Sequence, residues 1–178
     1  MPLILLRHTT PLVAEGTCYG RTDLPLTETF EQEAEQVIAE LPKIAKIVSS
    51  PLQRCRRLAD AVGQARGLAV TIEPNVTEMD FGTWEGRLWS DIPRQDIDQW
   101  AGDFLHGRPH GGESVAMLRA RVVSALAAFS DAPEPILIVT HSGVIRAALA
   151  KGDTADHFNT QIDFGGFISM PTEEFQDE

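Results

Sequence analysis

The sequence predicts a three-layer α/β/α fold, in which a mostly parallel sheet carries helices on both faces and a helical lid is inserted. Two observations predict it. Short apolar runs of strand length alternate along the chain with segments whose apolar residues recur at helical spacing. The short runs are continuously apolar, which is typical of strands that are buried on both faces of a parallel sheet.

The predicted strands are five apolar runs, which cover residues 3–6, 44–48, 69–72, 136–139 and 164–170. Helical patterns separate them, and parallel neighbours in a sheet need crossover connections of this kind.

Three helices are predicted from apolar spacing and from end signals. The first follows Thr27 as its cap and stops at Pro42, and the second follows Ser50 as its cap and ends before Gly67. The third has one apolar face over residues 115–129, and two prolines keep it from continuing.

The length of 178 residues corresponds to about one domain, and a composition of 43% hydrophobic and 23% charged residues allows a buried core. We therefore expect a single domain over residues 1–171 and an acidic tail over 172–178. The segment 81–112 holds all three tryptophans and shows no clear strand. It is predicted to be a lid at the rim of a pocket or, equally well, a second hydrophobic cluster.

Composition also excludes several partners. A formal net charge of −11 argues against a broad basic surface, so neither nucleic acid nor an anionic membrane is expected to bind. Cys18 and Cys55 are too few for a disulfide framework and lie in no metal-binding spacing. No apolar run reaches the roughly 18 residues of a membrane span, and the apolar start is too short for a secretory leader. A cytoplasmic protein is expected, of an oligomeric state that the sequence leaves open.

Two of the predicted strands end in the same way, with a histidine delivered to the loop that follows. His8 comes after residues 3–6, His141 comes after residues 136–139, and Arg7 adjoins the first histidine. The carboxyl ends of parallel strands form the ligand-binding edge of an open sheet, so the two imidazoles are expected within about 10 Å of each other. A single histidine is more often structural, but two at equivalent strand ends indicate a site.

A metal ion is the first alternative for such a pair, but no common metal-binding spacing of histidines occurs and no carboxylate adjoins either strand end. An anion fits better. Arg7 offers a planar fork for oxygen atoms, and His141 precedes a helix whose free N–H groups attract negative charge. Arg54 lies in the first turn of the second helix, where a cation is unfavourable unless an anion lies close by; a solvated arginine is the alternative.

These groups suit phosphoryl transfer through a histidine. A neutral imidazole nitrogen attacks phosphorus, arginines offset the charge on the phosphoryl oxygens, and no metal is required. The departing alkoxide needs a proton donor. Among the carboxylates that follow the third strand, Glu78 lies nearest to its end and is the predicted donor, whereas Glu85 is expected to be solvated at the surface.

Five segments, in order along nearly the whole chain, resemble the signatures of the histidine phosphatase superfamily, the phosphoglycerate-mutase-like enzymes. They are Leu6-Arg7-His8-Thr9, Ser49-Ser50-Pro51-Leu52-Gln53-Arg54-Cys55, residues 78–86, Gly111-Gly112-Glu113-Ser114 and Val139-Thr140-His141-Ser142-Gly143. The resemblance implies the α/β fold of that family and a reaction without a metal or an organic cofactor.

The resemblance also implies a role for each matching residue. His8 is the phosphorylated nucleophile, and Glu78 exchanges protons as acid and base. The phosphate pocket consists of Arg7, Arg54 and His141. The partner is then a small-molecule phosphate ester, hydrolysed through a phosphohistidine intermediate.

Two departures from the family pattern stand out: Thr9 replaces the usual glycine, and no asparagine matches a frequent further phosphate ligand in the next loop. The segment 16–26 resembles a loop of α-ribazole phosphatases, which act in cobalamin assembly. Ser142 is expected to contact the phosphate ester, and Tyr19 and Trp84 are expected to stack on a base or sugar, with ordinary packing as the alternative.

Several functions therefore remain open at this point. The expected one is a phosphatase acting on α-ribazole 5′-phosphate. The alternatives are a broad-specificity sugar or metabolite phosphatase, a phosphoglycerate-mutase-like enzyme, and a sensor that binds a phosphate ligand without turnover. His106 and His110 are expected to touch the substrate from the lid.

Overall fold

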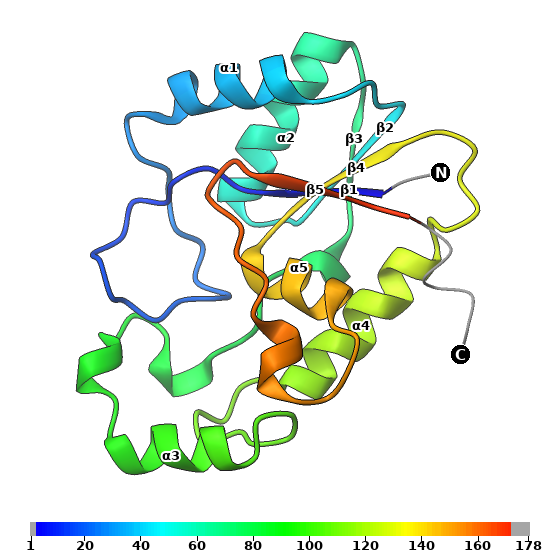
Figure 1. Ribbon diagram of the computed structural model, residues 1–178. Coiled ribbons are helices and arrows are strands. Elements are labelled where there is room, and N and C mark those ends of the chain that lie inside the picture. The colour runs from blue at the N-terminus through cyan, green and yellow to red at the C-terminus, as the bar shows by residue number, and fades with distance from the viewer. Residues whose placement is uncertain (1–2, 172–178) are drawn as a thin grey trace.

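A five-stranded sheet forms the middle layer of the protein in a computed structural model, which describes residues 3–171 (Figure 1). Its strands are β1 (Leu3–Arg7), β2 (Lys46–Ser49), β3 (Val70–Ile72), β4 (Ile136–Thr140) and β5 (Phe167–Met170). Their order is β3-β2-β4-β1-β5, and only β5, at the edge beside β1, runs antiparallel to its neighbour. The predicted α/β fold with a mostly parallel sheet is confirmed. The predicted tail lies outside the described residues.

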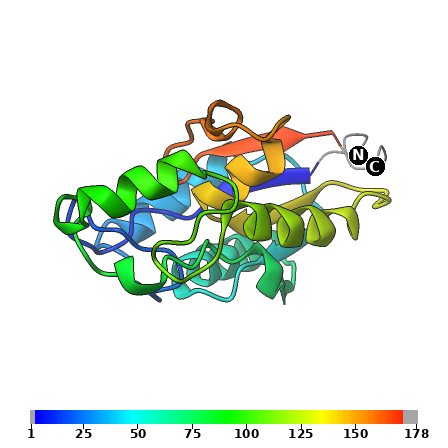
Figure 2. The ribbon, with the colours of Figure 1, turned by 90° about the horizontal axis from the view of Figure 1, so that it is seen from below.

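The two outer layers are helical. The α-helices are α1 (Phe30–Glu40), α2 (Gln53–Arg66), α3 (Arg94–Gly102), α4 (Val115–Ala127) and α5 (Ser142–Leu149). α1 and α2 cover one face of the sheet, and α4 and α5 cover the other (Figures 1 and 2). In β1, Ile4 and Leu6 pack with the first pair, whereas Leu3 and Leu5 pack with the second. Because successive side chains of a strand point to opposite faces, an unbroken apolar run fills both cores.

The helix ends agree only in part with the sequence signals. Gly67, with a φ of 66°, closes α2, and the Ser114 side chain caps α4 by accepting a hydrogen bond from a backbone N–H. The predicted caps Thr27 and Ser50 are wrong, because α1 and α2 both begin later along the chain and have no side-chain cap. The Ser50 hydroxyl instead contacts His141.

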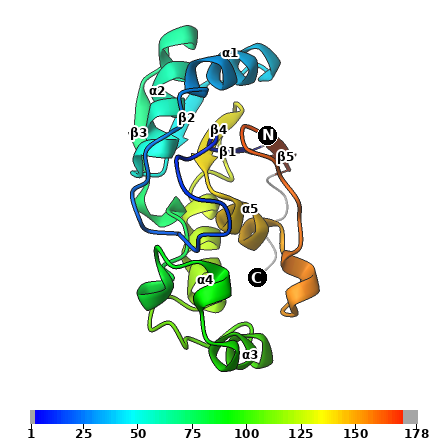
Figure 3. The same cartoon turned by 90° about the vertical axis from the view of Figure 1, so that its left-hand side faces the viewer.

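The segment 81–112 lies beside the loop that connects β1 to α1, beyond one side of the sheet (Figures 1 and 3). Backbone hydrogen bonds join the two segments, from Cys18 N to Arg87 O (2.7 Å) and from Gly86 N to Cys18 O (2.8 Å). Cys18 and Trp84 share a small buried cluster there. Within residues 3–171, no helix combines the length and the apolar character that crossing a bilayer requires.

Candidate active site

The two strand-end histidines meet. β1 and β4 are parallel neighbours with Arg7 opposite Thr140, so the next residues, His8 and His141, leave the sheet side by side. Their ring centroids are 5.2 Å apart and the ring planes meet at 63°. The expected convergence within about 10 Å is confirmed.

His8 is buried, with 2% of its surface exposed, and its ring is fixed by one hydrogen bond. Nδ1 lies 2.7 Å from the carbonyl oxygen of Thr9, which can only accept, so Nδ1 carries the proton and Nε2 keeps its lone pair. Burial, followed by the positive charges of Arg54 and Arg7, lowers the pKa of His8 to about 3, although the bond to Thr9 acts in the opposite direction. The His8 imidazole is therefore neutral at physiological pH, with the free lone pair on Nε2 that a nucleophile requires.

His141 is fully buried at the start of α5. Its Nε2 lies 2.8 Å from the Ser50 hydroxyl and 3.4 Å from Sγ of Cys55, and that thiol also lies 3.3 Å from the carbonyl oxygen of Thr140. Burial lowers the pKa of His141 well below its usual value, and the charge of His8 adds to the effect. A neutral ring here can donate a hydrogen bond to a phosphoryl oxygen, or gain a proton when the anion arrives.

Two arginines flank the histidines, and each has one donor that finds no acceptor in the part of the chain that the structure describes. Arg54 donates from its two terminal nitrogens to the carbonyl oxygens of Thr22 (2.7 Å) and Gly20 (2.6 Å), and Arg7 donates to that of Ile162 (2.7 Å). These carbonyls partly compensate the unfavourable position of Arg54 in the first turn of α2. The Nε atoms of both arginines are buried without a partner in the described part of the chain. Buried donors of this kind require an acceptor.

Glu78 is held at the start of α5. Its carboxylate accepts hydrogen bonds from the backbone N–H of Gly143 (3.0 Å) and of Met79 (2.9 Å). A Cβ atom at position 143 would overlap the carboxylate, so this close approach requires glycine. Arg121 donates to the Glu78 carbonyl oxygen (3.1 Å) and forms a mostly buried ion pair with Glu113 (2.6 Å), which fixes the segment that carries Glu78.

The expectation that Glu85 is solvated at the surface is wrong, because its carboxylate organises a loop. Its two carboxylate oxygens accept hydrogen bonds from the backbone N–H groups of Gly20, Arg21, Thr22 and Phe81, and from the Thr22 hydroxyl. Burial alone would raise the pKa of Glu85, but these bonds, that of the Thr22 hydroxyl foremost, outweigh burial and lower it. Since Gly20 and Thr22 also bind Arg54, Glu85 supports the arginine indirectly.

A cavity of about 260 Å³ opens from His8 and Glu78, with Arg7, Ser142 and Arg146 among its polar walls. Its apolar walls are Tyr19, Met79, Phe81, Trp89, Trp100, Phe104, Val115, Leu118 and Phe158. The aromatic rings come mostly from the segment 81–112, so this segment forms the rim of the cavity as well as a small core of its own.

Tyr19 and Ser142 line the cavity, but Trp84 does not. The Trp84 ring is 1% exposed and packs 5.0 Å from the ring centroid of His110. His110 is equally buried, and its Nδ1 accepts a hydrogen bond from a backbone N–H. The expectation that His110 touches the substrate is therefore wrong, because its side chain does not line the cavity. His106 lines a separate groove of about 820 Å³ between α4 and α5. Trp89 and Trp100 occupy the place that the sequence analysis gives to Trp84.

Sequence reasoning also missed Arg146 as a wall of the cavity. A signal for it exists, because Ser142 and Arg146 are four residues apart in one helix and therefore share a face. Cys55 is fully buried in the core, and its contact with His141 has no signal in the sequence. Among residues 3–171, no group of three or more His, Cys, Asp or Glu side chains is arranged to hold a metal ion.

A buried imidazole pair between two arginines, with one carboxylate close by at the edge of an α/β sheet, defines the class of histidine phosphatases. The family model for the "Histidine phosphatase superfamily (branch 1)" matches residues 3–163, and the chain belongs to this superfamily. Relatives in that family are phosphatases and mutases by name.

Three relatives illustrate the range. The chain is 31% identical over 159 residues to the adenosylcobalamin/alpha-ribazole phosphatase of Escherichia coli strain K12, covering 85% of this chain and 78% of that protein. It is 32% identical over 148 residues to a "Probable phosphoglycerate mutase GpmB" of Escherichia fergusonii, covering 78% and 68%. A solved structure named "putative alpha-ribazole-5'-P phosphatase" from Escherichia coli K-12 superposes with a TM-score of 0.83 at 28% identity, covering 95% and 89%.

Proposed function

We propose that the protein hydrolyses a small-molecule phosphomonoester through a phosphohistidine at His8, without a metal ion. The observation that carries the proposal is the pair of buried Nε donors of Arg7 and Arg54, which have no hydrogen-bond partner among residues 3–171 and flank two neutral imidazoles. A tetrahedral dianion supplies acceptors for both donors, and the nucleophile beside it is already deprotonated at Nε2.

In the first step, Nε2 of His8 forms a bond to phosphorus as the bond from phosphorus to the ester oxygen breaks. Glu78, in its acid form, gives its proton to the departing oxygen. Arg7, Arg54 and His141 hold the transferred oxygens, and the N-terminus of α5 adds positive potential. The hydrogen bond from Nδ1 to the Thr9 carbonyl keeps the ring oriented while it becomes positively charged.

In the second step, a water molecule attacks the phosphohistidine. Glu78 takes a proton from that water, the bond between phosphorus and Nε2 breaks, and inorganic phosphate leaves with the original His8 restored. Thr9 in place of glycine keeps the backbone carbonyl that accepts from His8, which supports turnover over the alternative of a sensor that binds phosphate without hydrolysis.

The substrate that we propose is α-ribazole 5′-phosphate, processed in the cytoplasm during cobalamin assembly. The aromatic walls of the cavity suit a planar base, and two relatives bear this activity in their names. A phosphoglycerate has no aromatic group to place there, and a sugar phosphate has none either. The expected order of kcat/KM is α-ribazole 5′-phosphate first, then sugar phosphates, then phosphoglycerates.

The mechanism is tested by rapid quench with a labelled aryl phosphate. We expect acid-labile, alkali-stable phosphate on the wild-type protein and none on His8→Asn. His110→Asn is the matched control, because it alters another buried histidine outside the phosphate site. If His8→Asn hydrolysed the ester at the wild-type rate, the mechanism would be wrong, and activity lost on exhaustive chelation would point to a metal enzyme instead.

The substrate is tested by comparing the wild-type protein with Trp100→Ala on the three substrate classes. Loss of one aromatic wall is expected to lower kcat/KM for α-ribazole 5′-phosphate about fivefold, since an aromatic contact contributes about 1 kcal/mol beyond its buried area. The value for 3-phosphoglycerate should change less. A wild-type preference for 3-phosphoglycerate, with transfer of the phosphoryl group in place of its release, would establish the mutase alternative.

A further inference from the structure

A tight turn just before β5 is bonded to the backbone of the residues that bear the site. The turn covers residues 163–166 and is closed by a hydrogen bond from Gly166 N to the carbonyl oxygen of the first residue (3.0 Å). Gly165, at its third position, has a φ of 73°, which the turn requires and glycine tolerates. Gly165 N donates to the carbonyl oxygens of Arg7 (3.2 Å) and His8 (3.1 Å), and Arg7 N donates to Gly166 O (2.9 Å). The turn therefore cannot move independently of these two residues.

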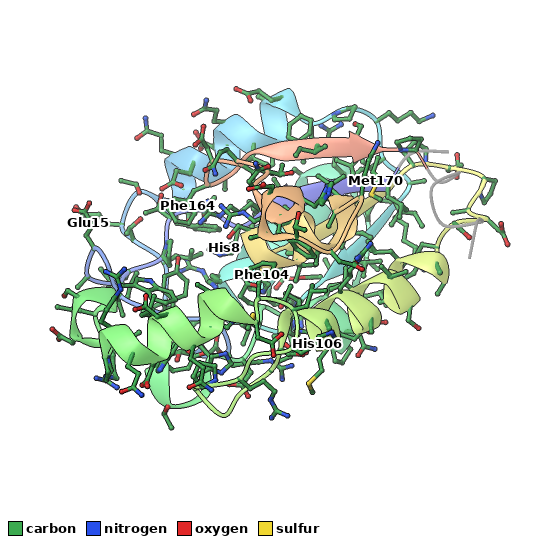
Figure 4. All side chains as sticks on the ribbon, turned by 60° about the horizontal axis from the view of Figure 1, so that its bottom comes forward. His8, Glu15, Phe104, His106, Phe164 and Met170 are labelled. Atoms are coloured by element: carbon green, nitrogen blue, oxygen red, sulfur yellow. The ribbon has the colours of Figure 1, made fainter. Side chains whose placement is uncertain are left out.

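The second position of this turn is Phe164, and its side chain lies over the phosphate-binding residues. The Cζ atom of Arg7 lies 3.8 Å from the Phe164 ring centroid, and the ring centroids of Phe164 and His8 are 5.6 Å apart (Figure 4). The ring remains 38% exposed to solvent. The rest of the ring is covered, and the Arg7 guanidinium and the His8 imidazole are among the groups that cover it.

We infer that Phe164 is a positioning residue that holds Arg7 in its phosphate-binding orientation, an inference that rests on the proposed function. A guanidinium stacked on an aromatic face keeps all its N–H groups in the plane, at right angles to the contact. One terminal nitrogen of Arg7 binds the Ile162 carbonyl, and Nε is left without a partner in the described residues. Stacking thus fixes the plane of the fork while leaving its edge open to a phosphoryl oxygen.

None of the five family segments of the sequence contains Phe164, so they assign it no role. The sequence analysis places position 164 at the start of a strand, whereas β5 begins at Phe167. The displaced start leaves Phe164 in the turn, where its side chain is free to reach Arg7.

The inference is tested by isothermal titration of inorganic phosphate into the wild-type protein, Phe164→Tyr and Phe164→Leu. Leucine keeps an apolar cover without a π face, and we expect it to raise the Kd for phosphate about two- to fivefold, the range of a half-exposed cation–π contact. Tyrosine should restore the wild-type Kd. Met117→Ala, which changes another exposed apolar side chain outside the site, should leave the Kd unchanged.

A double-mutant cycle separates action through Arg7 from a general effect. With an aryl phosphate, Phe164→Leu should lower kcat/KM mainly through KM, and the loss should disappear when Arg7 is already lysine, whose ammonium cannot stack in the same way. An unchanged Kd for Phe164→Leu, a Tyr variant as weak as the Leu variant, or a full loss in the Arg7→Lys background would each overturn the inference. Failure of the wild-type protein to bind phosphate would instead reject the proposed function.

Discussion

Replacement of Glu85 by glutamine tests whether the phosphate site depends on the loop over residues 20–22. One Glu85 oxygen accepts from Arg21 N (2.8 Å) and Phe81 N (3.2 Å), and the other from Gly20 N (3.0 Å) and from both donors of Thr22. Glutamine has a single acceptor oxygen, so its NH2 group must replace the other oxygen and face at least two N–H donors, with which it cannot form hydrogen bonds. The three remaining hydrogen bonds lose the help of the negative charge.

The magnitude follows from these losses. A charge-assisted hydrogen bond contributes about 1.5–3 kcal/mol, and a buried donor left unpaired costs about 1–3 kcal/mol. Water can replace part of this, because the Arg21 and Thr22 donors are exposed. We therefore expect Glu85→Gln to lower the free energy of unfolding by about 2–3 kcal/mol, which moves a urea midpoint by about 1 M. The loosened loop also frees Arg54, and kcat/KM should fall about tenfold.

The measurements are urea unfolding followed by circular dichroism, and initial rates with an aryl phosphate. Glu15→Gln is the matched control, since it removes the same charge from an exposed residue of the connection between β1 and α1 that also contains residues 20–22, at the edge of the molecule and away from His8 (Figure 4). A free energy of unfolding of Glu85→Gln within about 0.5 kcal/mol of the wild-type value would show that the loop does not depend on this carboxylate. Unfolding changed without any loss of kcat/KM would refute the link to Arg54.

Two further predictions concern the acid and the nucleophile. Gly143→Ala should displace the Glu78 carboxylate and lower kcat at least about tenfold with little change in phosphate affinity. Gly102→Ala is the control, because the space around that position is open and steady-state rates should not change. Equal kcat values for the two variants would show that catalysis does not depend on the close approach of Gly143 to Glu78. Burial lowers the pKa of His8 to about 3 from the ordinary histidine value of 6.5, so as the pH falls below 6.5 the unfolded chain binds a proton that the folded protein does not bind. The contribution of the neutral His8 to the free energy of unfolding is therefore fully present above pH 6.5 and decreases below it, with a slope approaching about 1.4 kcal/mol per pH unit. Unfolding measured without phosphate at pH 5 to 7 should show a shallower slope for His8→Asn than for the wild-type protein.

The sheet and the histidine pair could be predicted because they depend on local patterns. An unbroken apolar run is buried on both faces, and a parallel sheet brings all carboxyl ends to one edge. Any two residues that follow adjacent strands in register must then lie close together, as His8 and His141 do at 5.2 Å between ring centroids. The sequence does not state which strands are neighbours, but only one apolar run besides the first ends in a histidine.

The supporting residues could not be predicted, because their partners are backbone groups of distant loops. Glu85 and an ordinary solvated carboxylate have the same local sequence signal. What distinguishes Glu85 is a cluster of N–H donors about 60 residues away in the chain, from residues 20–22. For the same reason Trp84 and Trp100 were not separable: both lie in the aromatic lid segment, and only tertiary packing buries one ring and exposes the other to the cavity.

The Glu85 contacts also link two parts of the site that chemistry alone would treat separately. Arg54 belongs to the proposed phosphate pocket and donates to the carbonyls of the loop 20–22, while Glu85, from the segment that forms the rim, accepts from the N–H groups of the same loop. The rim segment carries Trp89 and Trp100, which line the cavity. A shift of the rim would reach the backbone carbonyls that hold Arg54 through these contacts. Under the proposed function, we therefore expect substitutions at the rim that change substrate preference to change the affinity for inorganic phosphate as well.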